Sequence, residues 1–371
     1  MMAQSDEALL MQQIARLVDT PGDGRGVRIE SIPAGLGTRR FFRVRQPSGH
    51  PPSVIARVEI RAEAPAAEAA APEPSLEPIR ARLEAEGLPV PKRIGGDPAL
   101  GIDLLEDVGD QSLQSMADQW APSARQDLYR SAAQLIPRLQ RITPLDGSPV
   151  AAFTRQFDEA LLKTKARKWL EWTLPRAWGR AASEQEVAAT RSAFALIQAA
   201  NQSAPRRLAH RDFKAANIHV IPDDEEASNF RLVLIDLQGA FMAPPEYDLV
   251  CLLRDSQVRL PESEVQAHLA TIRPQLPDTP EADEFLRRFD LLSVARLAKD
   301  ISHFVEAAAN RGDSRYVRFV PNGLHQLRQA AVRAAERDPE MADFAALCQG
   351  VPDHFAESLS QQSEDNPPCA P

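Results

Sequence analysis

The sequence predicts an α+β protein with two lobes, a small N-terminal lobe built on an antiparallel sheet and a mainly helical C-terminal lobe. At 371 residues the chain exceeds the usual size of one hydrophobic core. Residues 27–60 alternate β-branched or aromatic with polar residues and are broken by Gly and Pro clusters, as strands and turns are. Later segments repeat apolar residues at helical spacing. We expect lobes at 1–107 and 108–352, followed by a disordered polar tail at 353–371.

The small lobe begins with an expected amphipathic helix over residues 6–18. Three strands separated by a loop and a turn fill residues 27–60. The Ala-, Pro- and Glu-rich residues 62–78 lack apolar periodicity and are predicted to form a flexible connection, followed by a short helix over 79–86. The sequence GIDLLEDVGD at 101–110 fits a last strand and the hinge between the lobes.

The large lobe is predicted to contain helices over residues 122–141, 153–172 and 184–202, a helix starting within 246–255, and a long amphipathic helix over 282–309. The apolar stripe of the long helix is expected to face the core. It contains Phe285, Phe289, Leu292, Leu297, Ile301 and Phe304.

A second stripe of the long helix carries Arg296, Lys299 and His303 at three- and four-residue spacing. These side chains either present positive charge to an anionic group of a substrate or to a transferring phosphate, or form an ordinary solvated helix face. The sequence pattern alone leaves both interpretations open.

Composition excludes several classes of function. The formal net charge of −9 argues against nucleic acid or an anionic membrane as the main partner. No apolar run approaches the roughly eighteen residues of a membrane span, and the N-terminus lacks the pattern of a signal peptide, so we expect a cytoplasmic protein. The three cysteines have neither disulfide-framework nor zinc-ligand spacing, and Cys251 is expected in the core. Nothing in the sequence identifies a protein partner.

The segments LAHRDFKAANIHVI and RLVLIDLQGA carry the strongest chemical signal. Asn217 follows Asp212 by five positions, which is the spacing of a kinase catalytic loop. In such a loop the Asp accepts a hydroxyl proton and the Asn holds a metal ion. Asp236 ends an apolar run, residues 232–235, that is typical of a buried strand, and it is expected to be a second ligand of Mg²⁺ beside nucleotide phosphates.

Together with YDLVCLLRDS, these segments resemble the aminoglycoside phosphotransferase and choline kinase superfamily, which has a protein-kinase-like two-lobed fold. Four segments between about residues 79 and 321 are more specifically similar to bacterial anomeric kinases, which phosphorylate N-acetylmuramate and N-acetylglucosamine at the 1-hydroxyl in cell-wall recycling. The resemblance implies ATP as co-substrate, Mg²⁺ as cofactor and a small sugar as acceptor.

The resemblance also implies roles for particular residues. Asp212 would orient the sugar hydroxyl and take its proton, while Asn217 and Asp236 would bind Mg²⁺. Arg296 and Lys299 match basic residues of the resembling kinases and would contact the acceptor. By the same resemblance, nucleotide would be bound by Gly35, Gly37, Thr38, Arg57 and Glu106. The catalytic loop would be supported by His210, Arg211 and Asp248.

Two positions depart from the family pattern. Arg57 stands where most kinases of this shape have a strand Lys that pairs with nucleotide phosphates. Arg43 or Arg45 would be the substitute cation for these phosphates. Gly239 stands where an acidic residue is expected, so a second metal or a substrate contact would be missing.

Two further functions stay open from the sequence. The same fold serves kinases of aminoglycosides, choline-like compounds and other small alcohols. A polycationic acceptor would suit the acid-rich residues 222–228, but this segment is better explained as a hairpin tip pointing to solvent. A pseudokinase that binds nucleotide and a partner without turnover is the alternative of another class.

Overall fold

A computed structural model of the chain describes residues 2–18, 27–33, 39–46, 51–59, 74–117, 119–147, 150–222, 230–353 and 355. The chain folds into two compact units, each assembled from separate stretches of sequence. The first, here called the sheet unit, contains Met1–Glu73, Pro89–Asp110 and His219–Ile235. The second, the helical unit, contains Pro74–Leu88, Gln111–Ile218 and Asp236–Pro371.

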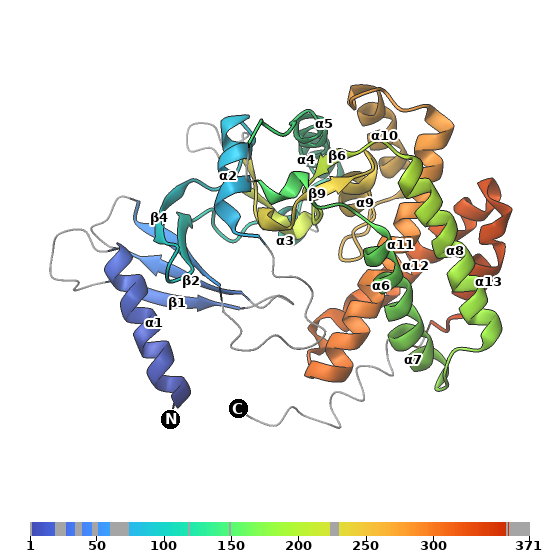
Figure 1. The fold of residues 1–371 in the computed structure, drawn as a ribbon, viewed down its shortest axis with the longest axis horizontal. Helices are drawn as coiled ribbons and strands as arrows, with labels where there is room; N and C mark the ends of the chain where they lie inside the picture. The colour runs from blue at the N-terminus through green and yellow to red at the C-terminus, as the bar shows by residue number, and fades with distance from the viewer. Residues whose placement is uncertain are drawn as a thin grey trace. The chain divides into compact units, whose positions relative to one another are not determined.

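The sheet unit is built on a five-stranded antiparallel sheet with the strand order β1-β2-β3-β5-β4 (Figure 1). The strand pattern expected over residues 27–60 is confirmed. The strands are β1 (Arg28–Ile32), β2 (Arg40–Arg45), β3 (Ser53–Val58), β4 (Arg93–Asp97) and β5 (Ile102–Glu106).

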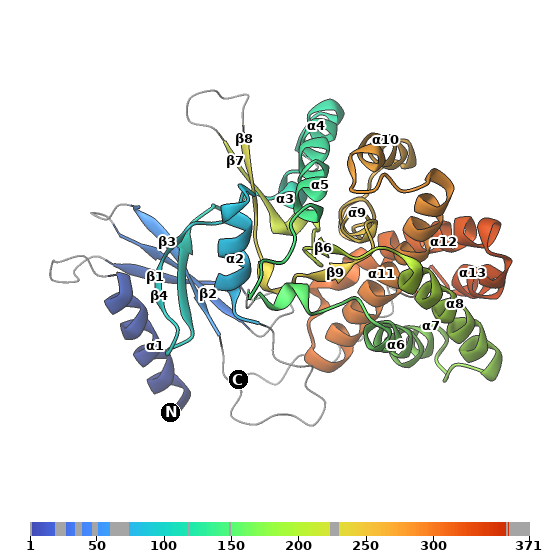
Figure 2. The same ribbon diagram turned by 45° about the horizontal axis from the view of Figure 1, so that its top comes forward.

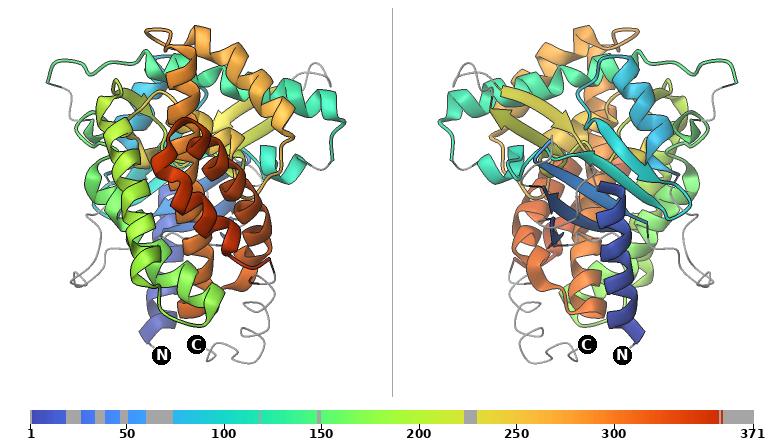
Figure 3. Two further views of the ribbon diagram at one scale, coloured as in Figure 1. Left: turned by 90° about the vertical axis from the view of Figure 1, so that its right-hand side faces the viewer. Right: turned by 90° about the vertical axis from the view of Figure 1, so that its left-hand side faces the viewer.

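One face of this sheet is apolar and is covered by α1 (Met2–Val18), which runs along it in Figure 3. Ile14 of α1 packs there against alternate strand residues such as Phe42 and Val54. Because side chains alternate across a strand, Arg43 and Arg57 of β2 and β3 lie on the opposite face.

A two-stranded sheet of β7 (Ile218–Pro222) and β8 (Phe230–Leu234) also belongs mainly to the sheet unit (Figure 2). The predicted hairpin is therefore present. Most of its acid-rich tip, residues 223–229, lies outside the described residues.

The helical unit contains the remaining helices and a small sheet of β6 (Arg207–Ala209) and β9 (Phe241–Ala243). Its helices are α2 (Leu76–Ala85), α3 (Leu113–Met116), α4 (Pro122–Ala133), α5 (Leu135–Gln140), α6 (Glu159–Lys168), α7 (Leu174–Trp178), α8 (Glu184–Ser203), α9 (Tyr247–Leu253), α10 (Glu262–Ile272), α11 (Ala282–Arg311), α12 (Val320–Arg337) and α13 (Ala342–Gly350).

The long helix α11 forms the centre of the helical unit and contacts α6, α8, α9 and α12 (Figures 1 and 3). All six residues of its predicted apolar stripe are buried, and Cys251 of α9 is buried as predicted. Helices predicted over 184–202 and 282–309 are confirmed as α8 and α11.

The helix predicted over residues 153–172 is wrong at its start. Ala151–Phe153 form a 3₁₀ turn (η1), and Gln156 makes a β-bridge with Met242. The helix α6 begins only at Glu159, because the Asp158 side chain accepts a hydrogen bond from the Leu161 N–H at 2.9 Å and caps it. After α6 the chain continues as a π-helical turn, Trp169–Thr173 (η2).

Other helix boundaries are smaller corrections. The helix predicted over 122–141 is divided into α4 and α5 around Gln134. The helix predicted over 79–86 begins earlier, at Leu76, with Pro78 in its first turn.

Most of the predicted disordered tail, residues 353–371, lies outside the described residues. Within it, Asp353 accepts a hydrogen bond from Arg328 Nη1 at 2.5 Å and Phe355 is buried. Among the helices of the described ranges, none combines the length and apolar character that a membrane span requires.

Candidate active site

The segment from His210 to Asn217 is held by two buried carboxylates of the helical unit. Asp248 of α9 accepts hydrogen bonds from the His210 N–H at 2.7 Å and from the Arg211 N–H at 3.1 Å. Asp255, which follows α9, accepts one from the Ala215 N–H at 3.1 Å. Each carboxylate therefore satisfies backbone donors that the loop cannot pair within itself, and together they fix its path.

Arg211 has a φ of +80°, in the left-handed region that non-glycine residues rarely enter. Such a conformation costs on the order of 1–3 kcal/mol and persists only where neighbouring contacts impose it. The hydrogen bond from its N–H to Asp248 is one of these contacts. This left-handed turn at Arg211 sets the direction in which the chain continues to the next residue, Asp212.

Asp212 is held by a buried arginine of α11. Arg296 Nη1 donates a hydrogen bond to Asp212 Oδ1 at 3.1 Å, and the Asp212 side chain keeps 32% of its surface exposed. Burial opposes ionisation, but the positive charges of Arg296, Lys299 and Lys214 outweigh it and hold the pKa of Asp212 well below its usual range. A carboxylate that is ionised at neutral pH and has an exposed edge can accept a hydrogen bond from an incoming hydroxyl.

Asn217 and Asp236 offer oxygen atoms of the kind that Mg²⁺ binds. Asn217 Nδ2 donates to the backbone oxygen of Asp212 at 2.9 Å, so its amide oxygen is oriented away from that bond. Asp236 is exposed, follows β8 in a left-handed conformation with a φ of +64°, and accepts a hydrogen bond from Gln238 Nε2 at 2.5 Å.

One carboxylate and one amide oxygen fit Mg²⁺ that is bound largely through nucleotide phosphates and water. A site that binds a metal ion through protein side chains alone would need more ligands than these two. Within the described ranges, no group of three or more His, Cys, Asp or Glu side chains is placed to hold a metal ion.

The basic stripe of α11 is buried at Arg296, partly buried at Lys299 and His303, and paired with carboxylates at its first two members. Arg296 is only 6% exposed and donates from Nε to Asp300 Oδ2 at 3.0 Å, besides its bond to Asp212. It also donates from Nη1 to the Arg211 carbonyl and to Cys251 Sγ, both at 3.2 Å. Lys299 Nζ donates to Asp300 Oδ1 at 3.1 Å. Nε and Nη1 of Arg296 thus donate to groups inside the protein.

His303, the third member of that stripe, does not present positive charge at neutral pH. Burial, assisted by the charges of Lys299 and Lys168, lowers the pKa of His303 to about 2. Of the two interpretations of the stripe, the cationic one therefore extends to Arg296 and Lys299 and not to His303.

Lys165 of α6 is a neighbour of this stripe that the sequence interpretation missed. It is 8% exposed, and its ammonium lies 5.4 Å from the centroid of the Phe157 ring. Burial, reinforced by the charges of Lys299 and Arg296, lowers the pKa of Lys165 to about 7. The signal was present: Lys165 stands between Leu162 and Trp169 at helical spacing, on the apolar side of its helix.

Gly239, where the family pattern has an acid, lies against Arg211. A Cβ at this position would be 3.5 Å from Arg211 Cδ, which is ordinary contact. Glycine is therefore not required by crowding at this site.

The predicted nucleotide-binding residues belong to the sheet unit. Gly35, Gly37 and Thr38 lie outside the described residues. Arg57 is buried and donates to Asp103 at 2.9 Å and to Glu59 at 2.7 Å. It is therefore bound within its own sheet.

The two substitute cations of the same unit are also paired with acids. Arg43 donates to Asp107 and Asp110 at 2.8 and 2.7 Å, and Arg45 lies 3.5 Å from Glu30. The hydrogen bond that Arg43 donates to Asp110 is the largest cause that raises the pKa of Arg43 above its already high value, and Asp107 adds to it while burial opposes both.

Glu106, the predicted hinge residue, ends β5. Its carboxylate accepts hydrogen bonds from Arg231 at 2.5 Å and from the Lys92 N–H at 3.1 Å. The Glu106 N–H itself donates to the Lys92 carbonyl at 2.8 Å.

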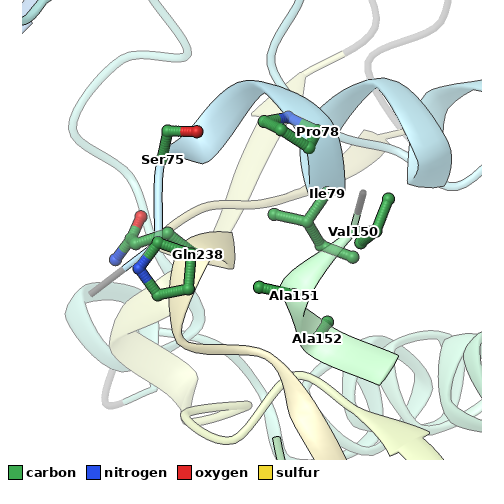
Figure 4. A pocket seen from close by; sticks show the side chains of 8 residues that line it. Ser75, Pro78, Ile79, Val150, Ala151, Ala152 and Gln238 are labelled. Atoms are coloured by element: carbon green, nitrogen blue, oxygen red, sulfur yellow. The ribbon is translucent and has the colours of Figure 1, made fainter. Parts of the chain in front are cut away.

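A small pocket of the helical unit lies where the start of α2 meets the turns η1 and η4 (Leu237–Gly239) (Figure 4). Its lining is mostly apolar, with Ser75 and Gln238 as the polar side chains. Gln238 also donates to Asp236, so the pocket adjoins this acid. None of the residues predicted to act in catalysis lines it.

Comparison with known proteins decides the family. Residues 28–286 match the model of the phosphotransferase enzyme family. The chain belongs to this family. It is accordingly a phosphotransferase with an alcohol group as acceptor, and the predicted superfamily is confirmed.

Relatives with assigned functions share about a quarter of their residues with the chain. The N-acetylmuramate/N-acetylglucosamine kinase of Pseudomonas aeruginosa is 27% identical over 275 residues, which are 73% of this chain and 75% of the relative. The kinase of the same name from Neisseria meningitidis serogroup B is 25% identical over 264 residues, 70% of this chain and 75% of the relative.

Solved structures confirm the protein-kinase-like fold class. The choline kinase LicA from Streptococcus pneumoniae superposes with a TM-score of 0.54 at 15% identity, covering 90% of this chain and 99% of its own. An ADP-bound aminoglycoside phosphotransferase superposes with a TM-score of 0.52 at 11% identity, covering 86% and 97%. At these identities the likeness extends to the fold alone.

Proposed function

We propose that this phosphotransferase moves the γ-phosphoryl group of ATP to the anomeric 1-hydroxyl of N-acetylmuramate or N-acetylglucosamine. The observation that carries the proposal is the ionised Asp212 carboxylate, held by Arg296 at 3.1 Å on a loop braced by Asp248. The names of the relatives support the choice of acceptor.

In this proposal Asp212 accepts the hydrogen bond of the sugar hydroxyl, orients it and takes its proton. Phosphoryl transfer has a loose transition state, so orientation and electrostatics matter more than the strength of the base. A carboxylate with a lowered pKa therefore suits the task. Asn217 and Asp236 would hold Mg²⁺, which when bound neutralises phosphate charge. His210, Arg211 and Asp248 support the loop.

The charges around Asp212 favour a neutral or anionic acceptor. Arg296, Lys299 and Lys214 are close enough to lower the pKa of Asp212, and Lys165 lies beside two of them. An aminoglycoside or a choline-like acceptor carries positive charge and would be repelled in a partly desolvated site. A sugar without a cationic group meets no such penalty.

A pseudokinase is the remaining alternative. It is disfavoured because Asp212, Asn217 and Asp236 are all present with oxygen atoms suited to phosphoryl transfer. For the nucleotide, Arg57 is paired with two acids, so a phosphate contact would have to displace them. Gly35, Gly37, Thr38 and Glu106 stay predictions for nucleotide binding.

The test is an ATP-consumption assay of the purified chain with N-acetylmuramate, N-acetylglucosamine, an aminoglycoside and choline. The phosphorylated position is located by ³¹P and ¹³C NMR. We expect turnover of the amino sugars at the 1-position. Asp212→Asn should lower kcat by about 10²-fold or more while Mg-ATP binding persists. The matched control is Asp127→Asn, an exposed residue of α4.

Turnover of the aminoglycoside or choline alone would contradict the sugar acceptor and leave the phosphotransferase assignment intact. Near-normal turnover by Asp212→Asn would remove this residue from the role of base.

A further inference from the structure

Three cations surround the buried Asp300, and within the described ranges one of them, Lys165, has no ion-pair partner. Arg296 binds both Asp212 and Asp300, and Lys299 binds Asp300. Across the described residues, the Lys165 ammonium has neither a hydrogen-bond acceptor nor an ion-pair partner. It makes a cation–π contact with the Phe157 ring. The group of Arg296, Lys299 and Lys165 therefore has one cation more than the two carboxylates neutralise.

A lysine at this position is expensive for folding. Ionisable side chains are rarely buried to this extent without a partner, because the ammonium loses its hydration. Lys165 lies on the stripe of α6 that also buries Leu162 and Trp169, where Leu or Met would pack without this cost. A ligand that supplies the missing anion explains why a lysine stands there.

The local structure holds Lys165 beside α11. The π-helical turn Trp169–Thr173 directly follows α6, and Thr173 Oγ1 lies 2.9 Å from Ser302 Oγ of α11, within hydrogen-bonding distance. Turns of this kind interrupt helices frequently at functional sites. Lys168, at the end of α6, is also tied to Glu306 of α11 at 2.5 Å. Two side-chain links thus fix the helix that carries Lys165 against the helix that carries Lys299.

We propose that Lys165 binds a carboxylate of the acceptor, with Lys299 as its neighbour, so that the site prefers an acidic amino sugar over a neutral one. The carboxylate is the lactyl group of N-acetylmuramate, which N-acetylglucosamine lacks. This inference rests on the proposed function, because the two sugars are taken as alternative acceptors of the same hydroxyl-directed reaction. Lys165 suits this role better than Arg296, because Nε and Nη1 of Arg296 already donate to Asp300 and Asp212.

The first test compares Lys165→Met with Lys163→Met. Methionine keeps the apolar stem and removes the charge. Lys163 is on the same helix but is 76% exposed and pairs with Glu159, so it is a matched control. We expect Lys165→Met to raise the KM for N-acetylmuramate roughly 10- to 100-fold, as loss of a charged hydrogen bond does. The KM for N-acetylglucosamine and the KM for ATP should change by less than about twofold.

Equal losses for both sugars would overturn the inference, because they would place Lys165 on the transferring phosphate or in a purely structural role. No loss for either sugar would overturn it as well. If the parent chain phosphorylates neither sugar, the proposed function fails first, and the labelling experiment below then decides on Lys165.

The pH dependence of the preference gives a second readout. The titratable and charged groups facing Lys165 are Arg296, Lys299, Asp300 and His303 of α11 and Cys251 of α9. Neither His303, with a pKa lowered to about 2, nor Cys251, with a pKa raised to about 12, changes its charge between pH 6 and about 9. The sugar carboxylate stays ionised between pH 6 and about 9, and effects of Asp212 on both sugars cancel in their ratio. As pH rises past 7, loss of the Lys165 proton should reduce the preference for N-acetylmuramate. In Lys165→Met the ratio should be flat, and a parental slope in this variant would contradict the assignment.

The third readout needs no turnover. A neutral lysine amine reacts with an acylating reagent, and mass spectrometry after a short exposure at pH 8 reports the labelled fraction of Lys165. D-lactate, the carboxylate fragment of the acidic sugar, should slow labelling of Lys165 and leave Lys163 unaffected. Inorganic phosphate is the competing probe. Protection by phosphate but not by D-lactate, or by neither, would contradict a carboxylate site.

Discussion

Arg296 joins the longest helix of the protein to the Asp212 carboxylate through a hydrogen bond of 3.1 Å from Nη1 to Oδ1. The same guanidinium donates from Nε to Asp300 at 3.0 Å, one turn further along α11. Its pKa is raised well above the usual value, because Asp300 and the other anionic neighbours outweigh burial. From these contacts we infer that Arg296 acts as a positioning residue, which sets the direction of Asp212.

Arg296→Lys tests this positioning role. Lysine keeps the charge, but one ammonium on a flexible stem cannot reproduce the fixed fork that reaches Asp212 and Asp300 together. We expect kcat to fall by about 10-fold or more for every acceptor, with the KM for ATP unchanged. Arg287→Lys on the same helix is the control, since Arg287 pairs with the remote Asp338. A loss confined to N-acetylmuramate would instead make Arg296 a ligand of the acceptor carboxylate.

Asp236→Asn tests the predicted metal ligand. Asparagine tolerates the left-handed backbone found at this residue, so the variant removes charge without adding strain. Binding of ATP in the presence of Mg²⁺ should weaken by about 10-fold or more, whereas binding without Mg²⁺ should not change. Calorimetric titrations with and without the ion measure both. An equal affinity of parent and variant for Mg-ATP would remove Asp236 from the metal site.

Asp248→Asn should weaken the loop that carries Asp212. Its two carboxylate oxygens each accept a hydrogen bond from a backbone N–H. An asparagine has one oxygen and one NH₂ group, so its NH₂ donor would face one of these two N–H donors. The free energy of unfolding should fall by about 1–3 kcal/mol, and amide exchange at His210 and Arg211 should accelerate. The control is Asp343→Asn on the exposed side of α13, expected to stay within about 0.5 kcal/mol. Unchanged exchange at both amides would show that the loop is held by other contacts.

Lys165→Met should stabilise the protein in a pH-dependent way. The pKa of Lys165 is lowered to about 7 in the folded protein, so between pH 7 and about 10 the unfolded chain binds a proton that the folded chain lacks. Parental stability should therefore rise across this window. The variant should be more stable by roughly 2–4 kcal/mol at pH 6, and the difference should shrink as pH rises. Urea unfolding at several pH values measures it, and a pH-independent difference would contradict the lowered pKa.

Much of the helical unit was predictable from local pattern. The apolar stripe of α11 repeats with helical period over 30 residues, so both its limits and its buried face were evident. Asp212, Asn217 and Asp236 were likewise predictable, because they stand in two short segments and each supplies an oxygen atom that phosphoryl transfer requires. The pairing of Arg296 with Asp212 was not predictable, because Asp212 is 84 positions away in sequence and only packing brings it close.

Lys165 shows why the remainder was missed. Its helix was predicted six residues too early, and a lysine within a helix usually extends into solvent, so its place between Leu162 and Trp169 did not by itself predict burial. The following π-helical turn changes the angular step per residue, so the face of one segment does not extend to the next. A regular 3.6-residue period cannot represent that change.

In the sheet unit, the partners of a strand residue could not be predicted from its local sequence either. Arg57 faces Asp103 because β3 pairs with β5 in one particular register, and a shift by one residue would place them on opposite faces. That register depends on turns and on packing against α1, neither of which the strand sequences specify. An arginine on a strand therefore had two equally good interpretations, a phosphate ligand or a cross-strand ion pair.

Cys251 has a practical consequence for spectroscopy. Its thiol donates to the Arg211 carbonyl at 3.3 Å and accepts from Arg296, and burial raises its pKa to about 12. Burial also raises the pKa of the Cys348 thiol. Because maleimides react with accessible thiolates, both cysteines should resist labelling while the fold is intact. With Cys369 replaced by serine, a cysteine introduced at an exposed position would carry a fluorophore or spin label at a single known place, with the native thiol beside Asp212 left untouched.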